Sequence, residues 1–408
     1  MVFKKVLLKD IAEVIMGSSP RSEFYSESEG VPFLQGTRTF GRMYPKIDTY
    51  TKKVTRMAKK NDILFSVRAP VGNINFAPTD LCIGRGLSCI KPISVDKKFL
   101  YYLLIGNIRM YESKSTGTIF SSINKKELES LEFEIPNIKV QKKIGSFLWF
   151  LDSKIELNNS IISNLEEFSQ TLFKRWFVDF EFPNEEGKPY KSSGGKMVES
   201  ELGMIPEGWE IQKIEQQSKI VRGGSPRPIK DYVQDTGIPW VKISDANASR
   251  TMYLQQTNEF IKEEGKSKSR EVFPGTLILS NSATPGIPMI MNIYACVHDG
   301  WLIFDEFEDI SKEYMYQFLK YERKNILTLS NGSVFRNLKT SILKKYPIIV
   351  PESNVLKDFQ KIIENIQSKI LNIDLECIKL ESLRDTLLPK LLSGEIELSD
   401  EEEVKELV

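Results

Sequence analysis

Residues 144–172 read IGSFLWFLDSKIELNNSIISNLEEFSQTL, and residues 359–387 read FQKIIENIQSKILNIDLECIKLESLRDTL. In both stretches apolar residues advance by alternating steps of four and three, over four heptads. A narrow stripe of this kind is typical of a coiled coil rather than of a helix lying on a sheet. The sequence therefore predicts two long helices, in which each position of the first stripe recurs 215 residues later.

The two stripes define a predicted helix–helix seam. Its positions are Ile144, Leu148, Leu151, Ile155, Asn158, Ile162, Leu165 and Leu172 in the first helix, and Phe359, Ile363, Ile366, Ile370, Ile373, Cys377, Leu380 and Leu387 in the second. An unpaired helix would leave its stripe in water, so we expect the stripes to bury each other, with Asn158 helping to fix the register. The alternative is that each helix packs only on its own globular domain.

The repeat continues outside the helices. Gly17, Ser19, Pro20 and Arg21 align with Gly223, Ser225, Pro226 and Arg227, and Gly117 and Phe120 align with Gly332 and Phe335. This period is far longer than the 20–50 residues of a solenoid repeat. Residues 63–67, 131–135, 277–280 and 346–350 have strand patterns, and residues 97–111 and 312–325 have the pattern of amphipathic helices.

The predicted fold class is α+β. We expect two similar mixed α/β globular domains separated by two long antiparallel helices that form a coiled coil, with pseudo-twofold symmetry. The expected boundaries are a first globular domain at 1–137, a first long helix at 138–180, a linker rich in Pro, Gly and Ser at 181–205, a second globular domain at 206–352, a second long helix at 353–392 and an acidic tail at 393–408.

The charge is unevenly distributed along the chain. Net charge is +1, but residues 1–137 hold 21 Lys and Arg against 14 Asp and Glu, while the tail 393–408 holds 7 acidic residues and one lysine. A basic first domain is compatible with a polyanion partner. The four cysteines form no CxxC pair, which argues against a zinc ribbon or a disulfide framework. With no signal peptide and no apolar run of membrane-spanning length, we expect a cytoplasmic protein that does not contact a membrane.

The sequence contains few residues or motifs typical of a catalytic site. The single histidine, His298, excludes metal sites with several histidines, so no metal site is expected. Gly265-Lys266-Ser267 resembles the end of a phosphate-binding loop, but Phe260 stands where that loop requires glycine. A binding protein is therefore predicted rather than an enzyme.

With these features, the chain resembles the specificity subunits of type I restriction-modification systems. The resemblance rests on residues 172–180 (LFKRWFVDF), 193–197 (SGGKM), 201–209 (ELGMIPEGW) and 387–392 (LLPKLL), and it spans nearly the whole chain. It implies two target-recognition domains that each read one half of a bipartite target in double-stranded DNA. It also implies that the helices dock two methyltransferase (modification) subunits, which restriction/translocase subunits join. S-adenosylmethionine, ATP and Mg²⁺ would be held by those partners, with no cofactor and no catalytic residue in this chain.

The candidate DNA contacts follow from comparing the two copies. Between Gly30/Gly237 and Ser66/Ser280 the offset grows from 207 to 214, so the second copy holds seven extra residues there. We hypothesise that these divergent segments contact bases and phosphates. Their candidate residues are Arg38, Arg42, Lys52, Lys53 and Arg56 in the first copy, and Lys242, Arg250, Lys266, Lys268 and Arg270 in the second.

Five further arginines are candidates outside these segments. Arg21 and Arg227 follow equivalent Gly-x-Ser-Pro turns, where a structural salt bridge is an equal alternative. Arg68 and Arg85 have no equivalent that the sequence alone aligns, and Arg336 follows Phe335 in the second copy. Two other functions stay open: a duplicated coiled-coil protein–protein scaffold that does not bind nucleic acid, and an unrecognised nuclease or methyltransferase.

Overall fold

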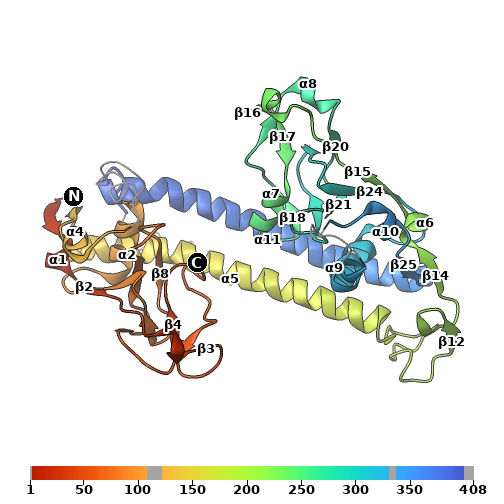
Figure 1. The fold of residues 1–408 in the computed structure, drawn as a ribbon, viewed down its shortest axis with the longest axis horizontal. Coiled ribbons are helices and arrows are strands. Elements are labelled where there is room, and N and C mark those ends of the chain that lie inside the picture. The colour runs from red at the N-terminus through yellow and green to blue at the C-terminus, as the bar shows by residue number, and fades with distance from the viewer. Residues whose placement is uncertain (1, 108–121, 330–336, 399–408) are drawn as a thin grey trace. The chain divides into compact units, whose positions relative to one another are not determined.

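The computed structural model describes residues 2–107, 122–329 and 337–398. The chain forms two compact units, one made of residues 1–156 and 378–408 and the other of residues 157–377. Each unit contains one globular domain and a segment of both long helices (Figure 1). Strand and helix labels below are those of Figure 1.

The domain of the first unit contains three β-structures. The first and last strands pair antiparallel, and two larger sheets have the orders β2-β10-β7-β8 and β3-β5-β4-β9-β6. The strands are β1 (Lys4–Leu7), β2 (Ala12–Met16), β3 (Tyr25–Ser26), β4 (Val31–Leu34), β5 (Tyr50–Thr51), β6 (Met57–Ala58), β7 (Ile63–Ser66), β8 (Ile74–Phe76), β9 (Leu81–Ile83), β10 (Leu87–Pro92) and β11 (Glu132–Ile135).

The domain of the second unit repeats this plan. Its first and last strands, β14 and β25, pair antiparallel, and its larger sheets have the orders β15-β24-β21-β22-β18 and β16-β19-β17-β23-β20. The strands are β14 (Glu210–Lys213), β15 (Ser218–Arg222), β16 (Val233–Gln234), β17 (Ile238–Val241), β18 (Tyr253–Leu254), β19 (Phe260–Ile261), β20 (Arg270–Val272), β21 (Leu277–Ser280), β22 (Pro288–Met291), β23 (Ala295–Val297), β24 (Trp301–Phe307) and β25 (Pro347–Val350).

The register of the parallel pairs shows that the two domains are copies. Phe33 of β4 lies opposite Cys82 of β9, and Trp240 of β17 lies opposite Cys296 of β23. These are the only parallel pairs besides β18·β22 in the described residues, and they occupy the same place in both sheets. The predicted α+β class with two similar domains is therefore confirmed.

Helices complete both units. The short ones are α1 (Leu8–Ile11), α2 (Lys97–Gly106) and α4 (Lys125–Glu129) in the first unit, and α6 (Ile214–Gln217), α7 (Ile243–Ala248), α8 (Glu263–Lys266), α9 (Lys312–Thr328) and α10 (Thr340–Lys344) in the second. Two single 3₁₀ turns lie at Ser22–Phe24 and Ile229–Asp231. The long helices are α5 (Ile138–Phe177) and α11 (Ser353–Ser393). None of these helices has an apolar stretch long enough to cross a bilayer within the described residues.

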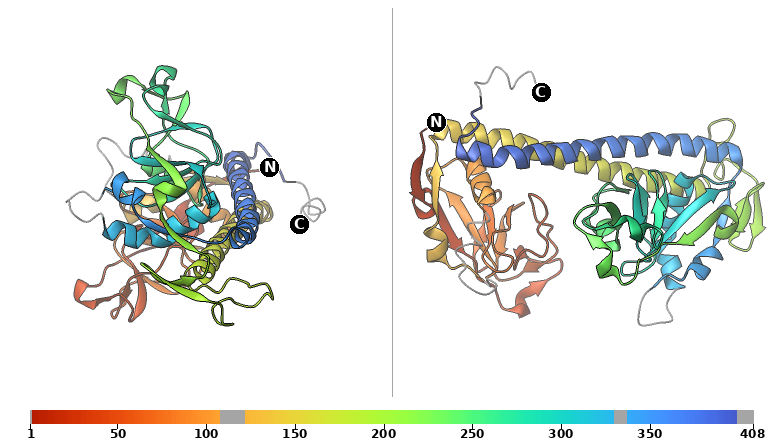
Figure 2. Two further views of the ribbon diagram at one scale, coloured as in Figure 1. Left: turned by 90° about the vertical axis from the view of Figure 1, so that its right-hand side faces the viewer. Right: turned by 90° about the horizontal axis from the view of Figure 1, so that it is seen from above.

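The long helices pair antiparallel, as expected. In the first unit Ile144 and Leu148 of α5 share a core with Leu388 and Leu391 of α11. In the second unit Ile162, which lies later in α5, shares a core with Phe359 and Ile370, which lie earlier in α11. Residue numbers therefore fall along α11 as they rise along α5. Figure 2 shows the segments of the two helices side by side within each unit.

The predicted seam is buried. None of its sixteen positions is exposed, and ten of them, from Ile144 to Cys377, are at most 4% accessible. The helices also pack on the domains, since Ile144 and Leu148 belong to the core of the first one. Both of the alternatives weighed for the helices are thus partly realised: each helix contacts its partner and a globular domain.

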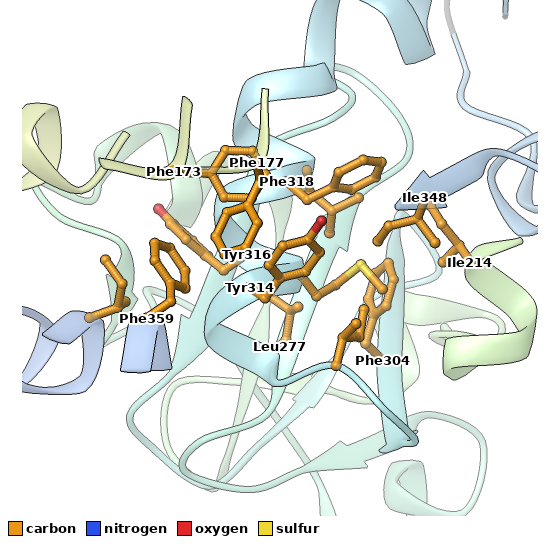
Figure 3. Packing of buried hydrophobic residues seen from close by; sticks show 14 of the residues in the cluster. Phe173, Phe177, Ile214, Leu277, Phe304, Tyr314, Tyr316, Phe318, Ile348 and Phe359 are labelled. Atoms are coloured by element: carbon orange, nitrogen blue, oxygen red, sulfur yellow. The ribbon is translucent and has the colours of Figure 1, made fainter. Parts of the chain in front are cut away.

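An aromatic cluster joins the helices to the second domain. Phe173 and Phe177 of α5 contact Tyr314 of α9 and Phe359 of α11, with ring centroids between 4.8 and 6.2 Å apart (Figure 3). These rings pack where α9 meets the pair of α5 and α11, and they hold the end of α5 against the domain.

The segment expected to be a linker is ordered. Helix α5 ends at Phe177, before the expected 180, and strands β12 (Met197–Ser200) and β13 (Gly203–Pro206) form a hairpin that extends one residue beyond the expected end of the linker at 205. Phe182 stacks on Tyr190 at 4.6 Å and on Trp209 at 4.9 Å. The aromatic residues among the glycines and prolines explain the order, because they bury apolar surface.

Candidate nucleic-acid interface

Three loop segments meet at one edge of the first domain. The amide of Ser18 donates to the carbonyl of Ile83 at 3.0 Å, and the amide of Ile83 donates to the carbonyl of Arg56 at 2.9 Å. Gly17 makes this approach possible, because a Cβ there would lie 2.2 Å from the carbonyl oxygen of Gly84. The three segments are held by backbone bonds, so the side chains that they carry are presented by a rigid frame.

Three predicted arginines emerge from this frame. Arg21 follows the first segment, Arg56 lies in the second and Arg85 in the third, and all three are exposed. The backbone amide of Arg85 donates to Ser19 Oγ at 3.1 Å, while the nearest acid of Arg21 is Glu23 at 3.9 Å. We call Arg21, Arg56 and Arg85 the first basic cluster. Exposed guanidinium groups on ordered loops suit contacts to phosphates or guanine edges.

The other exposed candidates of the first domain have partners of their own. Lys53 lies over the ring of Phe24 at 5.2 Å, and Lys52 pairs with Glu29 at 2.7 Å. Arg38 pairs with Asp48 at 2.7 Å, and this contact raises the pKa of Arg38 through a hydrogen bond and charge attraction. Arg68 is exposed and forms a backbone bridge with Ser122. Surface ion pairs of this kind are weak, so these side chains stay available to an anion.

The second domain builds the same frame from different residues. The amide of Gly224 donates to the carbonyl of Val297 at 3.1 Å, and Ser269 Oγ donates to the carbonyl of Gly224 at 2.8 Å. A Cβ on Gly223 would lie 2.3 Å from the carbonyl oxygen of His298. The glycine that begins each Gly-x-Ser-Pro turn is thus required by the same close approach in both copies.

The frame reveals an equivalence that the sequence comparison missed. Because Cys82 and Cys296 occupy the same place in β9 and β23, Arg85 corresponds to Asp299, at an offset of 214. Ser225 Oγ donates to Asp299 Oδ1 at 2.6 Å, and Arg222 and Arg227 lie 3.6 and 4.0 Å from its carboxylate. A cation in the first copy is therefore replaced by a carboxylate in the second.

The surroundings of Asp299 favour the ionised form of its carboxylate. Burial opposes ionisation of Asp299, but the hydrogen bond from Ser225 and the charges of His298, Arg222 and Arg227 lower its pKa. The pKa of His298 is lowered, mainly by burial, and its Nδ1 accepts a bond from the amide of Gly300 at 2.8 Å. A carboxylate of this kind can accept a hydrogen bond from the exocyclic amine of cytosine.

The remaining candidate DNA contacts of the second domain differ in how far their side chains are exposed and paired. Lys268 and Arg270 are exposed, and the ammonium of Lys268 lies 4.6 Å from the ring centre of Tyr232. Lys266 pairs with Glu271 at 3.2 Å, and Lys242 pairs with Glu259, each lysine side chain being 34% exposed. Arg336 lies outside the described residues. All these residues stay predictions as DNA contacts.

Two predicted DNA contacts lie elsewhere. The side chains of Arg42 and Arg250 are only 21% and 27% exposed, and their guanidinium groups contact acidic residues of the long helices. The sequence does not distinguish these two arginines from surface arginines, because nothing in it shows that their partners Asp152 and Asp374 are buried. The segment of the second copy that holds the seven extra residues is not made of loops alone. It also contains the short elements α7, β18 and α8, within 243–266.

Metal and thiol chemistry find no support in the described residues. No group of three or more His, Cys, Asp or Glu residues there is arranged to hold a metal ion. The four cysteines are free and buried.

Comparison with known proteins agrees with this picture. A family model described as the type I restriction modification DNA specificity domain matches residues 2–167 and 206–384. The chain is similar to the type I restriction enzyme MjaIX specificity subunit of Methanocaldococcus jannaschii, with 26% identity over 96% of this chain and 93% of the relative. It is also similar to the HindI specificity subunit of Haemophilus influenzae, with 28% identity over 83% of this chain and 87% of the relative. Its fold resembles that of the type I restriction-modification S subunit from M. genitalium, with a TM-score of 0.61, 17% identity and 96% coverage of both chains.

Proposed function

Because this chain belongs to the family of type I restriction modification DNA specificity domains, we propose that it reads a bipartite DNA target without catalysing a reaction. Each of its two domains recognises one half of the target. The observation that supports this proposal is the pair of matching sheet plans that carry different groups at equivalent loop positions, Arg85 in one copy and Asp299 in the other. A preserved scaffold with an altered reading surface suits two half-sites of different sequence.

Partner subunits supply the catalytic activities. Two methyltransferase subunits, which hold S-adenosylmethionine, dock on the helices and act on flipped adenines. Restriction subunits, which hold ATP and Mg²⁺, add ATP-driven translocation and cleavage. The complex acts on DNA in the cytoplasm.

The surface of the helices offers equivalent places for two copies of one partner. Phe168 of α5 is 54% exposed, and Leu383 of α11, 215 residues later, is 45% exposed. Large apolar side chains at equivalent positions of two repeats suit one partner surface used twice. We propose that each of these residues belongs to one methyltransferase docking site.

Methylation mapping tests the reading function. The full chain is assembled with its modification subunits, incubated with genomic DNA and S-adenosylmethionine, and the methylated positions are sequenced. We expect one motif with two specified halves and an unspecified spacer. Methylation without a bipartite motif would contradict the proposal, and so would methylation by this chain alone.

Mass measurement of the assembled complex tests the docking surface. We expect Phe168→Asp and Leu383→Asp each to reduce the bound modification subunits from two to one, and the double variant to bind none. Val2→Asp, at an 88% exposed apolar position outside the helices, is the matched control and should bind two. Two bound subunits in the double variant would refute these docking sites.

A further inference from the structure

The carboxylate of Asp152 is buried where four segments of the first unit converge. Its side chain, on α5, is 3% exposed. It accepts hydrogen bonds from Arg42 Nη2 at 2.8 Å, from Arg384 Nη1 at 2.8 Å and from the hydroxyl of Tyr102 at 2.6 Å. These donors come from the loop after β4, from α11 and from α2. One charged group thus ties the domain to both long helices.

Arg42 makes a second contact that strengthens this arrangement. Its Nη1 donates to Glu381 of α11, while its Nη2 donates to Asp152 of α5. A buried ion is costly unless its partners are well placed, and the planar guanidinium offers donors in a fixed fork. The side chain of Arg42 therefore bridges the two helices and holds a loop of the domain between them.

The second unit contains a corresponding anchor. Asp374 of α11 is 5% exposed and lies 3.2 Å from Nε of Arg250. It also accepts a hydrogen bond from Thr251 Oγ1 at 2.9 Å and another from Gln255. Nη1 of Arg250 lies 3.5 Å from Asn159 Oδ1 of α5. Here too an arginine of the domain reaches both helices.

The two arginines come from corresponding places in the two domains. Arg42 lies between β4 and β5, and Arg250 lies between β17 and β19, which are the same strands of the repeated sheet. The segments differ in length and sequence, yet each carries one arginine to a buried aspartate of the helix pair. Equivalent positions of the two helices are 215 residues apart, which pairs Asp152 with Gln367 and not with Asp374. The two anchors therefore use different helix positions to meet the same requirement.

We propose that Arg42 and Arg250 are positioning residues that fix the angle of each recognition domain on its helix segments, and so restrict the spacer length that the protein accepts between half-sites. This inference rests on the proposed function. Loss of an anchor leaves the reading surface of that domain intact but lets the domain tilt on the helices. Targets with a spacer one base pair too long or too short then become acceptable.

A direct DNA contact by these arginines gives a different result. If Arg42 reads a base, its substitution relaxes the sequence preference of one half-site and leaves the spacer preference unchanged. If Arg42 binds a phosphate, its substitution weakens binding to all sequences alike and reduces the salt dependence of binding. Spacer preference is therefore the readout that separates a positioning role from a DNA contact.

The test measures methylation by the assembled complex of Arg42→Met on targets with the native spacer and with spacers one base pair longer or shorter. We expect the ratio of the rates on native and altered spacers to fall by about tenfold or more, which corresponds to ~1.4 kcal/mol. Half-site sequence preference should stay that of the wild type. Arg38→Met is the matched control, because Arg38 lies in the same segment but is 73% exposed and pairs only at the surface with Asp48; its ratio should not change.

Further variants keep the test decisive. If Arg42→Met does not assemble, Arg42→Lys retains the charge without the fork and should relax the spacer preference partly. Arg250→Met tests the second anchor independently and should give the same relaxation. An unchanged ratio in these variants, or a changed base preference with an unchanged ratio, overturns the proposal. A wild-type complex without any bipartite motif would instead refute the proposed function itself.

Discussion

Asn158 of α5 donates a hydrogen bond of 2.8 Å to Glu376 of α11. Asn158 is 1% exposed and occupies a seam position among Ile155, Ile162 and their partners. A buried amide that finds a carboxylate on the facing helix is satisfied in only one register of the pair. This contact therefore specifies the alignment of the helices in the second unit.

Replacing Asn158 with alanine removes this hydrogen bond. We expect Asn158→Ala to lower the free energy of unfolding by about 1.5–3 kcal/mol, because the buried amide donates to a charged carboxylate. Urea unfolding of the full chain, followed by circular dichroism, measures the change. Asn164→Ala, at an exposed position of the same helix, is the control and should stay within about 0.5 kcal/mol of the wild type. Equal effects of the two substitutions would contradict the role of Asn158.

The glycines of the two Gly-x-Ser-Pro turns should not tolerate a side chain. In Gly17→Ala and Gly223→Ala the new Cβ would lie 2.2 and 2.3 Å from a backbone oxygen, so the loops must move apart. We expect each substitution to lower the free energy of unfolding by about 1–3 kcal/mol, measured by thermal unfolding. Gly36→Ala is the control, since no atom lies within 4 Å of its added Cβ. A neutral Gly17→Ala would show that the loops are not held as closely as described.

The equivalent positions Arg85 and Asp299 should govern different half-sites. Arg85→Ala should alter base preference or affinity in one half-site only, and Asp299→Asn in the other, by about 1–3 kcal/mol if either side chain contacts a base edge. Methylation rates on a panel of singly substituted targets measure this. Lys5→Ala, at an exposed side chain paired with Glu132 away from the loops, provides the control. Effects of both variants on the same half-site would contradict one domain for each half.

The buried thiol of Cys296 should contribute to alkaline sensitivity. Burial is the main cause that raises its pKa from 9.0 to about 11. The folded state therefore binds the thiol proton more tightly than the unfolded state, and this contribution is complete below pH 9 and is lost as the pH rises towards 11. We expect the stability of the wild type to fall more steeply over this range than that of Cys296→Ala, measured by urea unfolding at several pH values. Identical slopes would show that the thiol does not contribute.

The sequence predicts the parts of this fold that depend on periodicity. The heptad stripes give both long helices and their pairing, because apolar spacing alone determines which face a helix buries. The duplication gives the two domains, and the Gly-x-Ser-Pro turns give the location of Arg21 and Arg227. These features are local or repeated, so they are visible without knowledge of the tertiary contacts.

The parts that were not predicted depend on contacts between residues distant in sequence. The correspondence of Arg85 and Asp299 appears only when the parallel strands align Cys82 with Cys296. The contact between Arg42 and Asp152 spans 110 residues, and no spacing rule reveals it. A basic residue in a divergent segment looks the same in sequence whether it faces solvent or a buried acid.

The pairing of β1 with β11, and of β14 with β25, has a consequence for evolution. Lys4 lies opposite Ile135, and Glu210 lies opposite Val350, so the polypeptide enters and leaves each domain at neighbouring points. A module with adjacent ends can be exchanged by recombination as a cassette, while the surrounding framework keeps its course. New target sequences can therefore arise by shuffling whole domains between genes, without waiting for the gradual substitution of single contact residues.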